Sequence, residues 1–186
     1  MNIVFEQKKE KPKMLLHACC AVCAGYPVEY LSDEFDIDIL FYNPNIYPLE
    51  EYEKRMKDIK RYSGLKGVRL LVTDYEEYVF EDRIKGFENE PEGGKRCEIC
   101  FSLRLEKTAL LAKESGYDYF ATTLTLSPHK KHWIINAEGN KIAEKYKINY
   151  YSSNFKKNDG FKISNTIARQ FDFYRQNYCG CRYSIR

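Results

Sequence analysis

The chain has 186 residues, a formal net charge of +3 from 30 basic and 27 acidic side chains, and 44% hydrophobic residues. This balance excludes a polybasic protein and leaves enough apolar side chains for one core, so residues 1–186 are predicted to form a single domain. No apolar run approaches the ~20 residues that a membrane-spanning helix needs, and the N-terminus is too short and charged for a signal peptide. We therefore expect a cytoplasmic protein without a membrane partner, where thiols stay reduced.

Strand and helix signals alternate along the chain. In order, we expect a strand at 14–18, a helix at 19–31, a strand at 37–42, a helix from 48 to Gly64, a strand at 68–72, a helix at about 75–87, a helix at 97–114, a strand at 117–123, a helix at 131–146, a strand at 148–151 and a helix at about 164–178. The polar stretch 88–95 between two helices suits a lid or binding loop. Alternating strands and helices imply right-handed crossovers, so the fold class is α/β, with a doubly wound, mainly parallel sheet of about five strands.

All the cysteines of the chain fall in three tight clusters. They are Cys19, Cys20 and Cys23; Cys97 and Cys100; and Cys179 and Cys181. In a reducing compartment such clusters favour metal binding or redox chemistry over structural disulfides. The first cluster follows the first strand, where doubly wound sheets place their functional sites.

Four of these thiols form a plausible ligand set for one metal centre. Cys97 and Cys100 begin a helix, so their spacing puts both sulfurs on one face, and Cys19 and Cys20 lie where the chain turns after a strand. Four thiolates suit either a [4Fe–4S] cluster or a structural zinc ion. The vicinal pair is less usual for zinc, so iron–sulfur is favoured, with zinc and a bare thiol relay as alternatives.

Cys179 and Cys181 are separated only by Gly180. A disulfide between them closes a very small ring with strained geometry, and strained disulfides are easily reduced. The spacing is therefore typical of a redox-active pair. Two further metal ligands are the equally weighted alternative.

Several motifs, in order along nearly the whole chain, resemble the epoxyqueuosine reductase family of the QueH type. They are His17-Ala18-Cys19-Cys20-Ala21-Val22-Cys23, Phe41-Tyr42-Asn43-Pro44-Asn45-Ile46, Arg96-Cys97-Glu98-Ile99-Cys100-Phe101, Thr122-Thr123-Leu124-Thr125-Leu126-Ser127-Pro128 and Tyr174-Arg175-Gln176-Asn177-Tyr178-Cys179-Gly180-Cys181. One departure is Val22, where the family usually has proline.

The resemblance implies a fold, an activity and a set of site residues. It implies a Rossmann-like, nucleotide alpha-hydrolase-like fold. It also implies the last step of queuosine synthesis, the reduction of epoxyqueuosine at the tRNA wobble position without cobalamin. The family's [4Fe–4S] ligands match Cys19, Cys20, Cys97 and Cys100, and its redox-active pair matches Cys179 and Cys181.

The chemistry of epoxide removal sets further requirements. Leaving an alkene takes two electrons and two protons, whereas a [4Fe–4S] cluster passes one electron at a time. An external electron donor is needed, and the reaction requires either two rounds of external donation or a second redox centre, for which the C-terminal dithiol is the candidate. Alternatively, Cys23 and other remaining ligands hold a second metal ion such as iron, which acts as a Lewis acid on the epoxide oxygen. Candidates for proton donation or substrate binding are His17, Tyr42, Asn43, Asn45, Arg96, His129 and Lys130. The rival interpretation is a zinc-stabilised RNA-binding module without catalysis.

Overall fold

A computed structural model describes residues 10–185 and contains one five-stranded sheet in the order β3-β2-β1-β4-β5. Every strand pair is parallel. The strands are β1 (Lys13–His17), β2 (Asp36–Phe41), β3 (Arg69–Val72), β4 (Tyr119–Thr122) and β5 (Asn149–Tyr150). The predicted α/β class, with about five strands in a parallel, doubly wound sheet, is confirmed.

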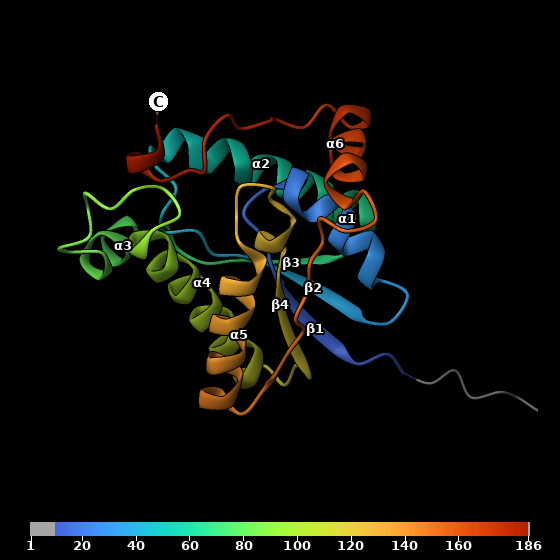
Figure 1. The fold of residues 1–186 in the computed structure, drawn as a ribbon. Helices are drawn as coiled ribbons and strands as arrows, with labels where there is room; N and C mark the ends of the chain where they lie inside the picture. The colour runs from blue at the N-terminus through green and yellow to red at the C-terminus, as the bar shows by residue number, and fades with distance from the viewer. Residues whose placement is uncertain (1–9, 186) are drawn as a thin grey trace, which may run out of the picture.

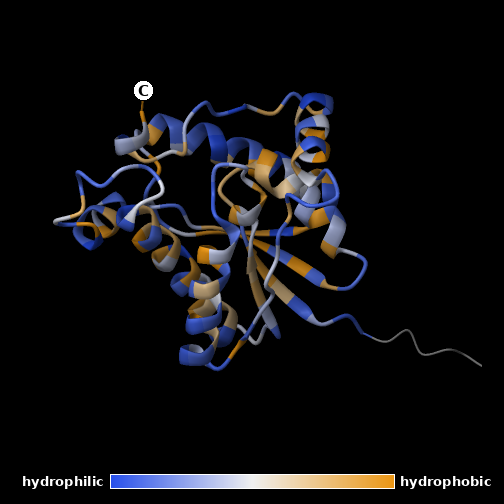
Figure 2. Cartoon of the chain, in the orientation of Figure 1, coloured by the Kyte–Doolittle hydropathy of each residue, from blue (hydrophilic) through white to orange (hydrophobic). Residues whose placement is uncertain are grey.

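Helices cover both faces of this sheet. One face carries α1 (Ala21–Leu31), α2 (Leu49–Lys66) and α6 (Gly160–Gln170), and the other carries α4 (Lys95–Glu114) and α5 (His132–Tyr146), with α3 (Glu77–Arg83) beside α4 (Figure 1). Because β1 is covered on both faces, it reads as a nearly continuous apolar run, visible at the centre of Figure 2. Within residues 10–185, no helix is both long and apolar enough to cross a membrane.

The strand order reverses between β1 and β4. Leu16 of β1 pairs with Ile39 of β2 on one side and Ala121 of β4 on the other. Ligand sites of doubly wound sheets lie beyond the carboxyl ends of the strands at such a switch point. Two segments leave the sheet there: the turn at 18–20 after β1, and the 3-10 helix η1 (Thr123–Leu126) after β4.

The last predicted helix is wrong in its position. It was expected at about 164–178, but α6 ends at Gln170 and residues 171–181 form an irregular segment. Asp172 has a left-handed backbone (φ 50°), and the Phe173 N–H donates to the Ala168 carbonyl, which closes the helix as a Schellman-type cap. This irregular segment is called the C-terminal strap below.

Other element boundaries shift by a few residues. The second helix does not end at Gly64, because Gly67, with φ 64°, provides the left-handed cap one turn later. The helix expected at 75–87 is only α3, which lengthens the loop before α4, and η1 was not anticipated. The remaining predicted strands and helices are found within two or three residues of their expected bounds.

Candidate metal centre

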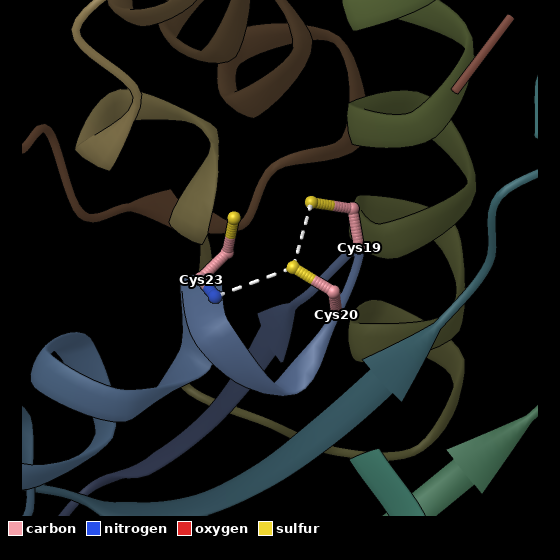
Figure 3. Close-up of side chains that lie close together, drawn as sticks. All are labelled: Cys19, Cys20 and Cys23. Atoms are coloured by element: carbon pink, nitrogen blue, oxygen red, sulfur yellow. Dashed lines mark hydrogen bonds between the residues drawn. The ribbon is translucent and has the colours of Figure 1, made fainter. Parts of the chain in front are cut away.

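Cys19, Cys20 and Cys23 form a compact group of thiols at the carboxyl end of β1 (Figure 3). Cys20 is the N-cap of α1, and its sulfur accepts a hydrogen bond from the Cys23 backbone N–H at 3.3 Å. The Cys19 and Cys20 sulfurs are 4.0 Å apart, and all three sulfurs lie within 4.8 Å of one another. Hydrogen bonds from Cys20 and Cys23 lower the pKa of Cys19 well below its usual value. Hydrogen bonding to Cys19 raises the pKa of Cys20 to about 12 and raises that of Cys23, so the three thiols share one thiolate at the spacing of metal ligands.

The other four cysteines line a second, smaller cavity. Cys97 and Cys100 come from the first turns of α4, and Cys179 and Cys181 come from the end of the C-terminal strap. Burial raises the pKa of Cys100 to about 12. Cys179 also lines the larger cavity, together with Cys19 and Cys23, so this one thiol lines both cavities.

Buried cations lie among these thiols. Arg104 is 2% exposed, and its guanidinium donates to the carbonyl and the sulfur of Cys100 at 3.0 and 3.3 Å. No carboxylate among residues 10–185 lies within 4.0 Å of it. An uncompensated buried charge costs several kcal/mol, and the groups that raise the pKa of Arg104 against burial are thiols, Cys100 foremost. The donor set thus fits an anionic thiolate cluster.

Lys130 adds a second cation at the larger cavity. Burial alone would lower the pKa of its ammonium group, but neighbouring thiols, Cys179 and Cys19 foremost, outweigh burial and raise it. Lys130 lies after η1, which itself follows β4, whereas Cys19 and Cys23 follow β1. Lys130 therefore brings a positive charge from the carboxyl end of β4 to the cavity that these thiols line. The switch point of the sheet brings these two segments together.

The larger cavity has a volume of about 470 Å³. Three of the thiols, two turns and the C-terminal strap surround it. Gln176 of the strap donates from Nε2 to the Cys20 sulfur at 3.1 Å, while its buried Oε1 has no hydrogen-bond partner. A buried carbonyl without a partner is costly, so Gln176 offers an acceptor to whatever molecule fills this space.

Helix α2 fixes the C-terminal strap over the thiols. Arg55, which is 1% exposed, forms an ion pair with Glu51 at 2.7 Å and donates to the carbonyls of Tyr178 and Cys179 at 3.2 and 3.1 Å. Gly180 has φ 124°, and a Cβ there would lie 3.0 Å from the Arg55 guanidinium. The glycine of the C-G-C motif is therefore required both by its backbone conformation and by this close approach.

Some predicted site residues do not reach either cavity. His17 is fully buried, with Nδ1 3.0 Å from the Thr122 hydroxyl and Nε2 3.1 Å from the Tyr42 carbonyl. Burial, followed by Arg104, lowers the pKa of His17 to about 4. Because the carbonyl needs a donor at Nε2, His17 is a neutral residue that ties neighbouring strands together. Tyr42 is 3% exposed, which leaves no free ring face for stacking.

Other predicted residues lie at the cavities in different ways. Asn45 lines the small cavity and Asn43 donates to the Ala18 carbonyl, and each has a buried Oδ1 without a partner. His129 and Lys130 line the large cavity. Arg96 is 3% exposed and donates to the carbonyls of Glu88 and Glu90, so it holds the preceding loop and is not available to RNA phosphates.

Sequence reasoning missed three features of the site. It treated Cys23 as an accessory ligand, although Cys20-Ala21-Val22-Cys23 has the same C-x-x-C spacing at a helix start as Cys97 to Cys100. It also missed the contact between Gln176 and Cys20, and the positions of Arg55 and Arg104. Those contacts join residues brought together only by folding, and no local pattern reveals them.

A parallel sheet with cations and clustered thiols at its switch point defines a cysteine-rich, doubly wound α/β protein. A family model described as epoxyqueuosine reductase QueH matches residues 14–186. The chain belongs to this family, which makes it an enzyme of the oxidoreductase class. The resemblance noted in the motifs is thereby confirmed.

Curated relatives are similar over most of their length. The epoxyqueuosine reductase QueH of Streptococcus pyogenes serotype M1 is 41% identical over 100% of this chain and 75% of its own. That of Staphylococcus epidermidis is 42% identical over 95% of this chain and 78% of its own. The protein of Dehalococcoides mccartyi with the same name is 34% identical over 93% and 92%.

Solved structures support the fold. A predicted tRNA methyltransferase subunit from Methanocaldococcus jannaschii gives a TM-score of 0.56 at 15% identity, covering 84% of this chain and 74% of its own. The U34-tRNA thiolase NcsA from Methanococcus maripaludis, solved with its [4Fe-4S] cluster, gives 0.57 at 11% identity, covering 96% and 63%. At these identities the likeness establishes the fold alone.

Proposed function

We propose that this protein reduces epoxyqueuosine in tRNA to queuosine, in the cytoplasm and with electrons from an external donor. The observation that supports this most is the 470 Å³ cavity at the switch point of the sheet, which is lined by Cys19, Cys23 and Cys179, the last of which also lines the smaller cavity of Cys97 and Cys100. The reaction removes the epoxide oxygen as water, consumes two electrons and two protons, and leaves a carbon–carbon double bond. The wobble nucleoside would enter this cavity.

A [4Fe–4S] cluster is the proposed cofactor, held by Cys19, Cys20, Cys97 and Cys100. Arg104 lies among these thiols, since Cys100, Cys179, Cys19 and Cys97 raise its pKa against the effect of burial. The cluster would supply electrons one at a time to the cavity. Positive charge close to a cluster, such as that of Arg104, favours the added electron.

The chain's own residues have separate tasks in this proposal. Lys130, at the cavity wall, holds the negative charge that develops on the epoxide oxygen and delivers a proton to it. Gln176 accepts a hydrogen bond from the substrate through its free Oε1. The C-terminal strap forms one wall of the cavity on which Cys19, Cys23 and Cys179 lie.

The second electron comes either from a second round of external donation or from a second redox centre, and a second metal ion would act as a Lewis acid on the epoxide oxygen. Cys179 and Cys181 either cycle between dithiol and disulfide or, with Cys23, bind a second metal ion such as iron. Cys179 lines both cavities, which supports a role between the proposed cluster and the substrate. The two alternatives differ in metal content, since only the second adds an iron beyond the cluster.

The test is reduction of tRNA-borne epoxyqueuosine by anaerobically purified enzyme with a strong one-electron donor. Nucleosides from digested tRNA are expected to lose the mass of one oxygen. Iron, zinc and sulfide analysis of the wild type, Cys97→Ala and Cys23→Ala identifies the ligands, because only the first variant should lose the cluster spectrum. A colourless zinc protein that binds tRNA and leaves its mass unchanged would establish the RNA-binding module instead.

A further inference from the structure

Phe161 is an aromatic side chain that the core of the protein does not use. It lies in the first turn of α6, is 41% exposed and lines the large cavity. Its carbonyl accepts a hydrogen bond at 2.8 Å from Asn165, one turn later on the same helix, which also lines the cavity. An exposed ring beside an amide on one cavity wall provides both a stacking surface and hydrogen-bonding groups for a planar heterocycle.

Lysines gather on two segments at the mouth of this cavity. Residues 127–133 and 154–162 together contain five lysines and one aspartate, a net charge of +4 in a chain whose total is +3. We call these two segments the lysine rim. Its lysines are Lys130, Lys131, Lys156, Lys157 and Lys162.

The two segments of the lysine rim are joined in space. The Lys156 ammonium donates to the Lys130 carbonyl at 2.7 Å, and Asn154 is 3.4 Å from the His132 ring. The pKa of His132 is lowered by burial and then by Lys156 and Lys157, as expected for cations crowded together. Such a concentration of like charge is unfavourable in the free protein and is relieved by a polyanion.

The extent of the rim indicates a nucleic-acid strand as its occupant. One phosphate beside the cavity needs only Lys130, which lines it, whereas Lys131, Lys157 and Lys162 are exposed outside it. A single nucleotide would leave those charges without partners. A strand that places one base in the cavity and its neighbouring phosphates along the rim would use all of them.

We propose that Phe161 stacks on the nucleobase that enters the cavity and that the lysine rim binds the phosphates on either side of it. This inference rests on the proposed function, and it names the residues by which the same site recognises RNA. Direct stacking makes Phe161 a binding residue for the target base. The rim lysines position the strand and carry no base information.

The base contact is tested by fluorescence anisotropy of the cluster-loaded enzyme with an unmodified anticodon stem-loop RNA. Stacking energies predict that Phe161→Ala weakens binding about 5- to 150-fold, while Phe161→Tyr restores most of the affinity. Ile163→Ala is the matched control, because Ile163 is exposed on the same helix and does not line the cavity. Wild-type affinity in Phe161→Ala would overturn the stacking assignment.

The phosphate contacts are tested by the salt dependence of the same binding. Binding weakens as salt rises, and each lost phosphate contact to a single strand makes the slope of log K against log salt shallower by about 0.7. Lys131→Gln/Lys157→Gln should therefore make the slope shallower by about 1.4. Lys113→Gln/Lys141→Gln removes the same charge near the C-terminal ends of α4 and α5, at the opposite edge of the sheet, and should leave the slope unchanged. Equal slopes for the two double variants would refute the rim.

Two further measurements separate this inference from the proposed function. If guanosine monophosphate competes as strongly as the stem-loop, the rim is not a strand-binding surface and the inference fails. If Phe161→Ala reduces epoxyqueuosine-tRNA with the wild-type KM, the reaction stands and only the inference fails. If the wild type binds the RNA but never changes its mass, the proposed function fails while the surface stands.

Discussion

Replacing Arg55 by methionine should detach the C-terminal strap from α2. The guanidinium makes three hydrogen bonds in a buried position: one to Glu51 and one each to the carbonyls of Tyr178 and Cys179. Methionine has a similar length and can fill much of the space, but it leaves a buried carboxylate and two buried carbonyls without these donors. The substitution therefore tests polar interactions more than packing.

The magnitude follows from these contacts. Breaking a buried ion pair by removing one partner costs about 3–5 kcal/mol, against a total stability of about 5–15 kcal/mol for a typical protein. Tyr174 also donates to Glu51, at 2.7 Å, which keeps the carboxylate partly satisfied and places the expected loss near the lower figure. Arg55→Met/Glu51→Met removes both charges and should be more stable than Arg55→Met alone.

The assays are urea unfolding followed by circular dichroism, and labelling of Cys179 by a maleimide in the native protein. Arg55→Met should lower the free energy of unfolding by about 3 kcal/mol and speed the labelling, since the strap carries this thiol. Arg55→Lys is the control that keeps the charge and loses the two-carbonyl fork. A loss below about 0.5 kcal/mol with an unchanged labelling rate would refute the claim that Arg55 holds the strap.

Three further outcomes are expected. Burial alone would raise the pKa of Glu106, but Lys145 and Arg83 outweigh burial and lower it. Glu106→Gln should therefore lower the free energy of unfolding by about 0.5–1 kcal/mol at pH 7, and this difference should shrink as the pH falls through the lowered pKa. A pH-independent difference in urea unfolding would contradict this. Cys179→Ser/Cys181→Ser should abolish turnover while the visible spectrum of the proposed cluster persists, and wild-type turnover would make the pair peripheral. If Cys20 is a ligand as proposed, Gln176→Leu should shift the reduction potential of the proposed cluster in a spectroscopic titration, because the Gln176 N–H contacts the Cys20 sulfur; an unshifted potential counts against that role.

The sequence predicted the strands of the sheet better than it predicted the C-terminal strap. Buried strands such as β1 are recognised in the sequence as apolar runs. Because the strands are parallel, the turns that follow them all lie at the carboxyl edge of the sheet. The C-terminal strap was read as helix because residues 171–178 contain no proline or glycine. Its course depends instead on Asp172, in a left-handed conformation, and on Asp58, whose carboxylate accepts the Tyr174 N–H from a position 116 residues away in the chain. Contacts of that range leave no periodic signal.

The placement of the thiols follows the same division. That Cys19 and Cys97 both lie toward the carboxyl edge of the sheet was predictable from topology, because each follows or begins an element that meets this edge. How six of the seven thiols divide between two cavities was not predictable, because the division depends on where the strap lies. Cys179 lines both cavities, and Arg55, paired with Glu51 of α2, is one of the groups that hold the strap there. The buried ion pair thus gives α2, which contributes no thiol, control over the distance between the proposed cluster and the C-G-C pair, and hence over the path by which a second electron would reach the substrate.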